Sequence, residues 1–396
     1  MVKLLTTGTF AIATAVKHAD VDVISAYPIR PYTGVMNALA RMIADGEFDA
    51  EYIVVDSEHT QFEVAKHAAA CGARVFTGSA GIGWAYAHEP IVVTPGCRQP
   101  VVAMVGTRAL DDPGNFGVEH NDVLAERDMG WMICFPENPQ EAYDLTLMAY
   151  KIAENPKVLL PIAIACDGNF ITHVRFPVDL PEADVAREFL PPTPPPRPSV
   201  LHPDKPIILC PHTDYYWGME FRRQLDEAMR NAREVTREVH KEFNKIFGRG
   251  GPPFIEEIAT EDAEVVLVGM GGMTMVARAA IREMRKEGIK VGFVKVRRFR
   301  PFPDEELREA LKKYRAIGVI DNDFSLGAPN HGGILYQEVR STLYDLEDGP
   351  YVINFMAGLG GREITVEYMR KMYDIVLKVA KTGKVEQPVY WIGLRE

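Results

Sequence analysis

Residues 21–31 read VDVISAYPIRP, a short run of β-branched and apolar residues that closes on two prolines. Such a run predicts a buried strand and a turn, and a helical pattern over residues 33–43 follows it. The same alternation predicts further strands at 52–55, 74–77, 100–105 and 158–165, and helices at 61–71 and 140–153. Apolar strands that alternate with helices predict an α/β fold with a doubly wound parallel sheet, covered on both faces.

The rest of the chain predicts a linker and a second, smaller α/β domain. Residues 191–198 read PPTPPPRP, which is extended and stiff, and a polar helical stretch then ends at the glycine- and proline-rich residues 248–253. Strands and helices alternate again from residue 264. We therefore expect a first domain, a connecting arm and a second domain over residues 1–190, 191–253 and 254–396.

The composition excludes several classes of protein. With 396 residues, of which 47% are hydrophobic and 25% charged, the chain is neither disordered nor fibrous. A net charge of -11 without a basic run argues against a nucleic-acid partner. No apolar run reaches the roughly 20 residues of a membrane span, and the N-terminal residues lack the apolar core of a signal peptide. These features predict a soluble cytoplasmic protein that does not contact a membrane.

The spacing of the cysteines indicates whether this chain could bind a metal ion or an iron–sulfur cluster. No two of them are close enough in the sequence to form a CxxC pair, so the chain alone could not ligate zinc or an iron–sulfur cluster. The histidines show no metal-ligand spacing either. We therefore expect no metal site, and reduced thiols at Cys71, Cys97, Cys134, Cys166 and Cys210.

Charged residues follow several predicted strands, at the edge where α/β sheets bind ligands. Glu58 lies between a strand and a helix, and is either a ligand-binding carboxylate or an acid that stabilises the helix N-terminus. Arg30 and Arg108 each follow a strand, and are either surface side chains or two cations that converge on a small dianion. Residues 111–117, DDPGNFG, predict either a solvated turn or a mobile loop that changes which side chain faces the substrate.

Several segments resemble those of the 2-oxoacid:ferredoxin oxidoreductases. AYPIRP at 26–31 resembles their YPITP segment, and SEH at 57–59 resembles their SEH segment. HNDVLAERDMGW at 120–131 is similar to their HSD…RDTGW segment. The likeness extends in order along nearly the whole chain, through residues 77–83, 295–303 and 358–365.

This resemblance implies the α subunit of an enzyme that uses thiamine diphosphate. The first domain resembles the pyrimidine-binding domain of such enzymes, and the last resembles a transketolase C-terminal domain. The family's diphosphate- and Mg²⁺-binding motif is absent from this chain, so a β subunit is expected to carry it together with an iron–sulfur cluster. Further 4Fe-4S clusters are expected on a ferredoxin-like γ or δ subunit, with ferredoxin as the electron acceptor.

The resemblance also implies roles for single residues. Glu58 would hydrogen-bond the aminopyrimidine ring of the cofactor, with Pro28 and Ile29 beside it. Arg108 would hold the substrate carboxylate, and Phe116 would line the substrate pocket.

Two departures from the family's pyruvate enzymes point to another substrate. Arg30 stands where those enzymes have threonine, and Asp111 and Asp112 stand in a loop that is mostly apolar in them. A second cation suits a second carboxylate, and the smallest such substrate is oxalate. We therefore expect oxidation of oxalate to two CO2 without coenzyme A, and an inward movement of Asp111 or Asp112 that offsets the arginine charges. The alternatives are pyruvate or another 2-oxoacid with coenzyme A, and a non-catalytic assembly subunit.

Overall fold

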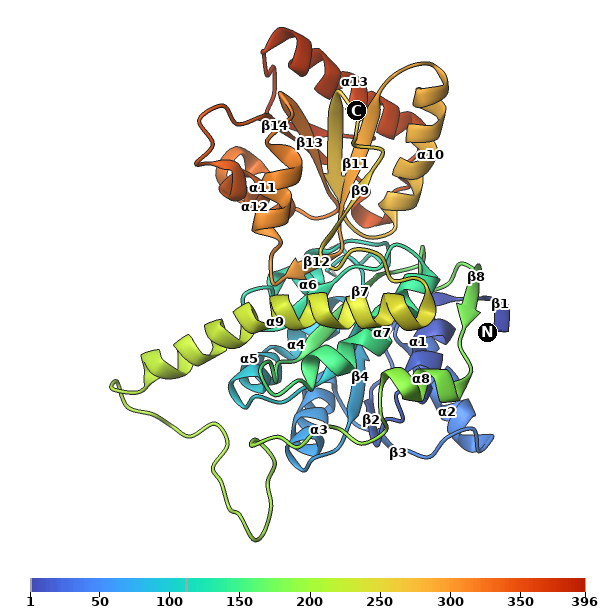
Figure 1. The fold of residues 1–396 in the computed structure, drawn as a ribbon, viewed down its shortest axis with the longest axis vertical. Coiled ribbons are helices and arrows are strands. Elements are labelled where there is room, and N and C mark those ends of the chain that lie inside the picture. Colours follow the sequence, from blue (N-terminus) through green and yellow to red (C-terminus); the bar gives the residue numbers. More distant parts are fainter. Residues whose placement is uncertain (1, 111–112, 396) are drawn as a thin grey trace.

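Seven strands form the first sheet of the computed structural model, which describes residues 2–110 and 113–395 (Figure 1). Their order is β12-β6-β7-β5-β4-β2-β3, and all neighbours except the β12–β6 pair run parallel. The parallel strands are β2 (Val23–Ala26), β3 (Glu51–Val54), β4 (Val75–Ser79), β5 (Val102–Thr107), β6 (Met132–Cys134) and β7 (Ile162–Asp167). The predicted parallel α/β sheet is confirmed.

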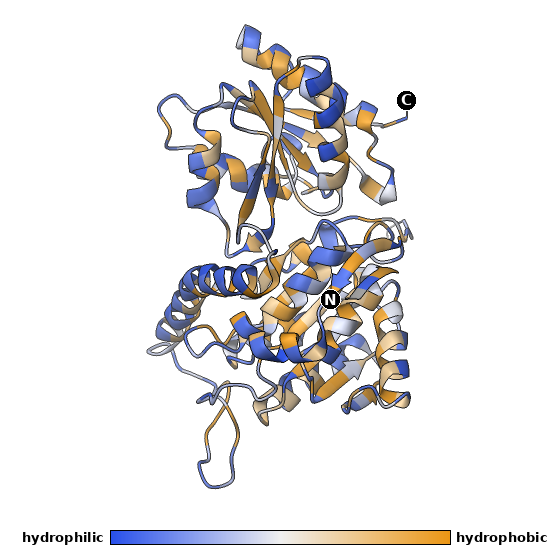
Figure 2. Cartoon of the chain, turned by 45° about the vertical axis from the view of Figure 1, so that its right-hand side comes forward, coloured by the Kyte–Doolittle hydropathy of each residue, from blue (hydrophilic) through white to orange (hydrophobic). Residues whose placement is uncertain are grey.

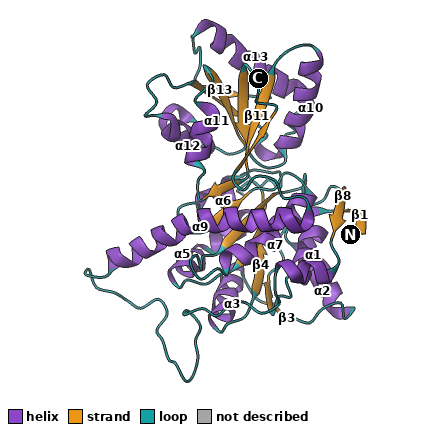
Figure 3. Ribbon diagram, in the orientation of Figure 1, coloured by secondary structure: helices purple, strands orange, loops and turns teal. Residues whose placement is uncertain are grey.

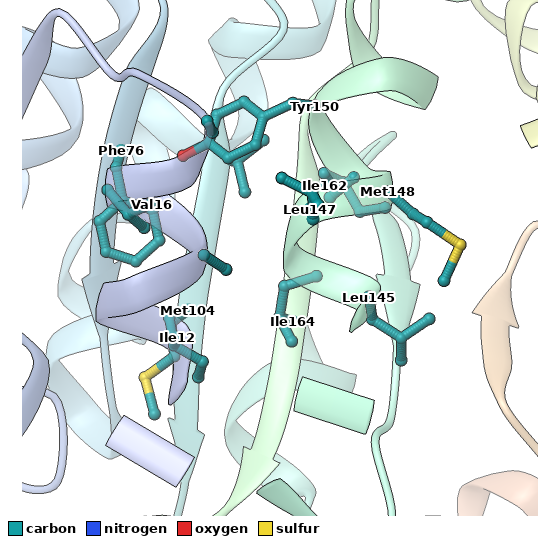
Figure 4. Packing of buried hydrophobic residues seen from close by; sticks show 14 of the residues in the cluster. Ile12, Val16, Phe76, Met104, Leu145, Leu147, Met148, Tyr150, Ile162 and Ile164 are labelled. Carbon is teal, nitrogen blue, oxygen red and sulfur yellow. The ribbon is translucent and has the colours of Figure 1, made fainter. Parts of the chain in front are cut away.

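Helices cover both faces of this sheet because neighbouring residues of its strands point to opposite sides. Phe76 and Met104 pack in one core, whereas Val75 and Val105 pack in the other. The first face carries α1 (Gly8–His18), α2 (Thr33–Ala44) and α7 (Pro139–Ala153); the second carries α3 (Glu58–Ala70), α4 (Gly81–Tyr86), α5 (His88–Gly96) and α6 (Asn121–Ala125). Figure 4 shows α1 and α7 meeting the strands on the first face.

A two-stranded sheet and one further helix lie outside the main sheet of the first domain. Strand β1 (Val2–Thr6) pairs antiparallel with β8 (Phe176–Leu180), and α8 (Ala183–Phe189) follows. Strand β1 leads directly into α1, which is not among the predicted helices. This helix is buried along most of its length, so it lacks the alternation of apolar and polar faces that reveals a surface helix.

A second sheet has six strands in the order β15-β14-β13-β10-β11-β9 (Figure 3). Its strands are β9 (Ile255–Ile258), β10 (Val265–Gly269), β11 (Val291–Val296), β13 (Ala316–Asp321), β14 (Tyr351–Met356) and β15 (Val389–Trp391). Its helices are α10 (Met273–Lys286), α11 (Asp304–Leu311), α12 (Ile334–Leu343) and α13 (Val366–Thr382). These strands and helices form a second α/β domain, as the sequence predicts.

The strand β12 (Arg298–Arg300) links the two sheets. It follows β11 of the second sheet but pairs antiparallel with β6 at the edge of the first. A buried cluster of charges lies beside this crossing, where the Lys295 ammonium is 2.7 Å from the Glu141 carboxylate of α7. The second domain is thereby joined to the first by a shared sheet edge and by a salt-bridge network.

The expected connecting arm, residues 191–253, contacts the first domain at both of its ends. Near its start, the Arg197 guanidinium donates a 2.6 Å hydrogen bond to the carbonyl oxygen of Ala69. The 30-residue helix α9 (Gly218–Phe247) buries its later turns against α7 and ends at Gly248, whose φ is 67°. Between these contacts, a long loop and the first turns of α9 extend away from the body (Figures 1 and 3).

A disulfide bond ties this loop back to the first domain. Cys210 in the loop is bonded to Cys97, which directly follows α5. The expectation of reduced thiols is therefore wrong for these two residues, because a separation of 113 residues hides their proximity in the sequence. The other three cysteines are free.

Hydropathy follows the layers of the fold. Figure 2 shows hydrophobic strands in both sheets and a largely hydrophilic α9. No helix in the described part of the chain is both long and apolar enough to cross a membrane.

Candidate active site

Glu58 is the first residue of α3, at the carboxyl edge of the first sheet. The hydroxyl of Ser57 caps this helix by accepting a hydrogen bond from the Thr60 N–H at 3.2 Å. The Glu58 side chain is buried against the turn that opens α4. A Cβ atom at Gly83 would overlap the Glu58 carboxylate and would lie 2.7 Å from the Ile29 Cδ1 atom. Glu58, Ile29 and the backbone of Gly83 therefore form one closely packed wall.

Pro28 and Ile29 lie in the segment that follows β2. Pro28 is exposed, whereas Ile29 is half-buried and packs against the first hydrophobic core. Ile29 thus places an apolar side chain beside the Glu58 carboxylate.

Arg30 and Arg108 line a single pocket of about 350 Å³. Arg30 is exposed, whereas Arg108 is buried at the end of β5. Phe116 lies in the same pocket, with its ring centroid 4.9 Å from the Arg108 guanidinium carbon. The Arg108 side chain packs directly against the backbone of Gly81, because a Cβ atom at Gly81 would lie only 2.6 Å from the Arg108 Nε atom. Two cations and an aromatic ring thus surround one opening.

The loop that carries Phe116 is attached to the second domain. Asp111 and Asp112 lie outside the described residues. Beyond them, the Asn115 side-chain amide donates a 3.2 Å hydrogen bond to the Gly360 carbonyl oxygen. The Ala109 N–H donates to the Gly117 carbonyl oxygen at 2.9 Å and closes the base of the loop. One wall of the pocket therefore rests on the contact between the two domains.

Comparison with known proteins identifies the family. Residues 14–241 match the family described as pyruvate flavodoxin/ferredoxin oxidoreductase, thiamine diP-bdg, and residues 263–369 match pyruvate:ferredoxin oxidoreductase core domain II. The pyruvate synthase subunit PorA of Methanocaldococcus jannaschii is 42% identical over 98% of this chain and 97% of its own. This chain belongs to the 2-oxoacid:ferredoxin oxidoreductase family. It is a subunit of an oxidoreductase, as the resemblance predicts.

Other members and solved structures agree on the family and the fold. The ketoisovalerate oxidoreductase subunit VorA of Pyrococcus abyssi is 38% identical over 100% of this chain and 98% of its own. The 2-oxoglutarate:ferredoxin oxidoreductase of Magnetococcus marinus superposes with a TM-score of 0.69 at 15% identity, over 96% of this chain and 65% of that chain. A split gene transketolase superposes with a TM-score of 0.57 at 15% identity, over 95% of this chain and all of that chain. The two structures support the predicted thiamine-enzyme fold with a transketolase-like second domain.

Two buried residues near this pocket, Asp122 and His120, are not among the predicted site residues. Asp122 lies in the first turn of the short helix α6. Burial raises the pKa of its carboxyl to about 7, although three backbone N–H groups and His120 oppose the shift. His120 Nε2 lies 2.9 Å from the Asp167 carboxylate. Burial alone would lower the pKa of His120, but the Asp167 charge and hydrogen bond raise it. The resemblance of segment 120–131 was the one sequence signal that could have identified both.

No metal site appears in the described ranges, 2–110 and 113–395, where no three His, Cys, Asp or Glu side chains cluster as ligands.

Proposed function

We propose that this chain is the α subunit of a thiamine-diphosphate-dependent oxidoreductase whose substrate carries two carboxylates, with oxalate the smallest candidate. The observation that carries this proposal is the placement of Arg30 and Arg108 on one pocket of about 350 Å³. A guanidinium group pairs bidentately with a carboxylate, so two of them match the two ends of a dicarboxylate.

The residues beside this pocket fit the aminopyrimidine ring of thiamine diphosphate. Glu58 offers a buried carboxylate, and Ile29 offers an apolar side chain next to it. Pro28, which precedes Ile29 and is exposed, would add apolar surface for the ring. Glu58 would hydrogen-bond the ring, and Gly83 leaves room for this carboxylate because it has no side chain. When bound, thiamine diphosphate supplies the nucleophilic carbon and accepts the electrons of the cleaved bond.

The arginines would bind and orient the substrate. Arg30 and Arg108 would neutralise its two charges as it leaves water, and Phe116 would hold the Arg108 guanidinium in place by packing on it. These cations also stabilise the bound carboxylates, which opposes loss of neutral CO2. An acidic group from Asp111 or Asp112 would offset that effect, and this role stays a proposal from the sequence.

The reaction proposed for the complex is the conversion of one oxalate dianion into two CO2 and two electrons. No acyl group remains, so coenzyme A is not needed. The electrons would pass to ferredoxin through iron–sulfur clusters on a β subunit and on a ferredoxin-like γ or δ subunit. The β subunit would also supply the diphosphate and Mg²⁺ site.

Pyruvate, or another 2-oxoacid, with coenzyme A is the second candidate, and the comparisons favour it over oxalate. The relatives described above are named for pyruvate and for ketoisovalerate, and neither name supports oxalate. Their identities to this chain, 42% and 38%, lie close together although their named substrates differ. Sequence identity over the whole chain therefore does not distinguish one substrate from another. The residues that line the pocket bear more directly on the choice of substrate.

The test is ferredoxin or viologen reduction by the anaerobically purified complex, with oxalate alone or with pyruvate plus coenzyme A. We expect oxalate turnover without coenzyme A, and a drop of about 10²-fold in kcat/KM for oxalate in Arg30→Thr, because a charged contact is lost. Arg41→Thr is the control, since the Arg41 side chain is 85% exposed and pairs only with Asp45 among the described residues. Turnover of pyruvate with coenzyme A and none of oxalate would instead select the second candidate.

A further inference from the structure

The Asp122 carboxylate joins three backbone segments beside the pocket. Its Oδ2 atom accepts hydrogen bonds from the Gly81 N–H at 2.8 Å and from the Arg108 N–H at 3.1 Å. Its Oδ1 atom accepts from the Val123 N–H at 2.7 Å. The side chain is fully buried, so water does not compete for these bonds.

Each of the first two bonds holds one wall of the site. Gly81 begins the first turn of α4, whose Gly83 lies against Glu58 and Ile29. Arg108 directly follows β5 and lines the pocket. Gly81 has a φ of 51°, and the Arg108 Nε atom would lie 2.6 Å from a Cβ there. One carboxylate oxygen thus fixes the turn beside Glu58 and the backbone of Arg108 relative to each other.

We infer that Asp122 is a positioning residue, which holds the Arg108 guanidinium and the Glu58 wall in the relative placement that substrate binding requires. Asp122 acts through these backbone groups and not by touching the substrate. The inference rests on the proposed role of Arg108 in binding a carboxylate, and it applies equally to oxalate and to a 2-oxoacid.

Two substitutions at Asp122 distinguish the hydrogen bonds from Gly81 and Arg108 from the one from Val123. Asp122→Ala removes all of the accepting oxygens and leaves buried N–H groups unsatisfied. Asp122→Asn can keep one oxygen at the Oδ2 position, which serves both Gly81 and Arg108, and loses only the bond from Val123. The inference therefore requires that the asparagine variant retain substrate binding and that the alanine variant bind substrate much more weakly.

The experiment measures kcat and KM in the assembled complex, with whichever acid the unmodified complex turns over. We expect Asp122→Ala to raise KM about 100-fold with a smaller change in kcat, because a displaced Arg108 weakens ground-state and transition-state binding alike. We expect Asp122→Asn to stay within about fivefold of the unmodified KM. Because the acid is chosen by the unmodified complex, failure of the oxalate proposal leaves this test intact.

Asp321→Ala is the matched control. Asp321 is also a fully buried carboxylate that accepts backbone hydrogen bonds, from the Leu335 N–H at 2.8 Å and the Tyr336 N–H at 3.2 Å, but it lies in the second sheet. Its loss should lower the melting temperature and leave KM unchanged. An unmodified KM in Asp122→Ala, or equal KM values in the alanine and asparagine variants, would overturn the inference, as would a similar rise in KM in Asp321→Ala.

A second variant covers the case in which Asp122→Ala does not assemble. Gly81→Ala places a Cβ atom against Arg108 at a position with positive φ, and should raise KM about tenfold by displacing the same guanidinium. A Gly81→Ala complex with unmodified KM would contradict the inference independently of Asp122.

Discussion

At the scale of single residues, the proposed role of Glu58 is to hydrogen-bond the aminopyrimidine ring of the cofactor through its carboxylate. The side chain is buried beside Ile29, and Gly83 leaves the space that its carboxylate occupies. An amide in place of this carboxylate keeps the shape but cannot gain or release a proton.

We therefore predict that Glu58→Gln lowers kcat of the complex by about 10²–10⁴-fold, the usual range for general acid–base catalysis, without lowering its melting temperature by more than a few degrees. The measurement is ferredoxin reduction together with thermal unfolding. Glu89→Gln is the control, because the Glu89 side chain is 75% exposed and lies 3.1 Å from His59. Full activity in Glu58→Gln would favour the alternative of a non-catalytic assembly subunit.

At the scale of secondary-structure elements, the two halves of α9 differ in their surroundings. Phe243 in the later half is fully buried, with its ring centroid 5.1 Å from that of Phe189 and 4.3 Å from that of Phe247. Phe221 in the first turn is 42% exposed. The later half is thus part of the core of the first domain, whereas the first turns extend beyond it.

Substitutions on this one helix test the difference. Phe243→Ala should lower the free energy of unfolding by about 3–5 kcal/mol, because it removes a buried aromatic ring and leaves a cavity. Phe221→Ala should lower it by less, about 1 kcal/mol, because Phe221 is 42% exposed and its truncation removes less buried surface. Urea unfolding of the purified chain measures both values, and equal effects at the two positions would contradict the observed packing.

At the scale of the whole molecule, a buried cluster of charges connects the domains. The Lys295 ammonium on β11 lies 2.7 Å from Glu141 and 3.2 Å from Glu137, and Arg297 pairs with Glu141 as well. Burial alone would raise the pKa of Glu141, but the Lys295 and Arg297 charges lower it to about 2. The ionised form of Glu141 therefore stabilises the folded chain above its ordinary pKa, and this stabilisation is lost as the pH falls from about 4.5 toward 2.

We predict that Glu141→Gln destabilises the chain by about 3 kcal/mol at pH 7, because it leaves buried cations with fewer partners. The difference in the free energy of unfolding between the unmodified chain and Glu141→Gln should be about 1 kcal/mol smaller at pH 4 than at pH 7. At pH 4 the ionised Glu141 carboxylate stabilises the folded state less than it does at pH 7. Urea unfolding at pH 7, 5 and 4 gives these values. Glu305→Gln, at a side chain that is 74% exposed, should show a small effect that does not vary with pH, and the same behaviour in Glu141→Gln would contradict the prediction.

The sequence by itself determined the α/β class and most of the strands, because strands and helices leave local patterns of apolar residues. The strand predicted at 74–77 is β4 at Val75–Ser79, and the one predicted at 100–105 is β5 at Val102–Thr107. The motifs at residues 26–31 and 57–59 were enough to indicate the family. They also supplied Arg30 and Glu58 as candidates, and Arg108 was chosen because it follows a predicted strand; the roles of all three stay predictions.

Only the tertiary structure decided which distant residues meet. The crossing of β12 to the first sheet, the bond between Cys97 and Cys210, and the contacts of Asp122 with Gly81 and Arg108 all join residues that are well separated in the chain. Local sequence patterns carry no record of such pairings, because each depends on how whole elements pack. For the same reason, the placement of Arg30 and Arg108 on one pocket became visible only when the strands lay side by side.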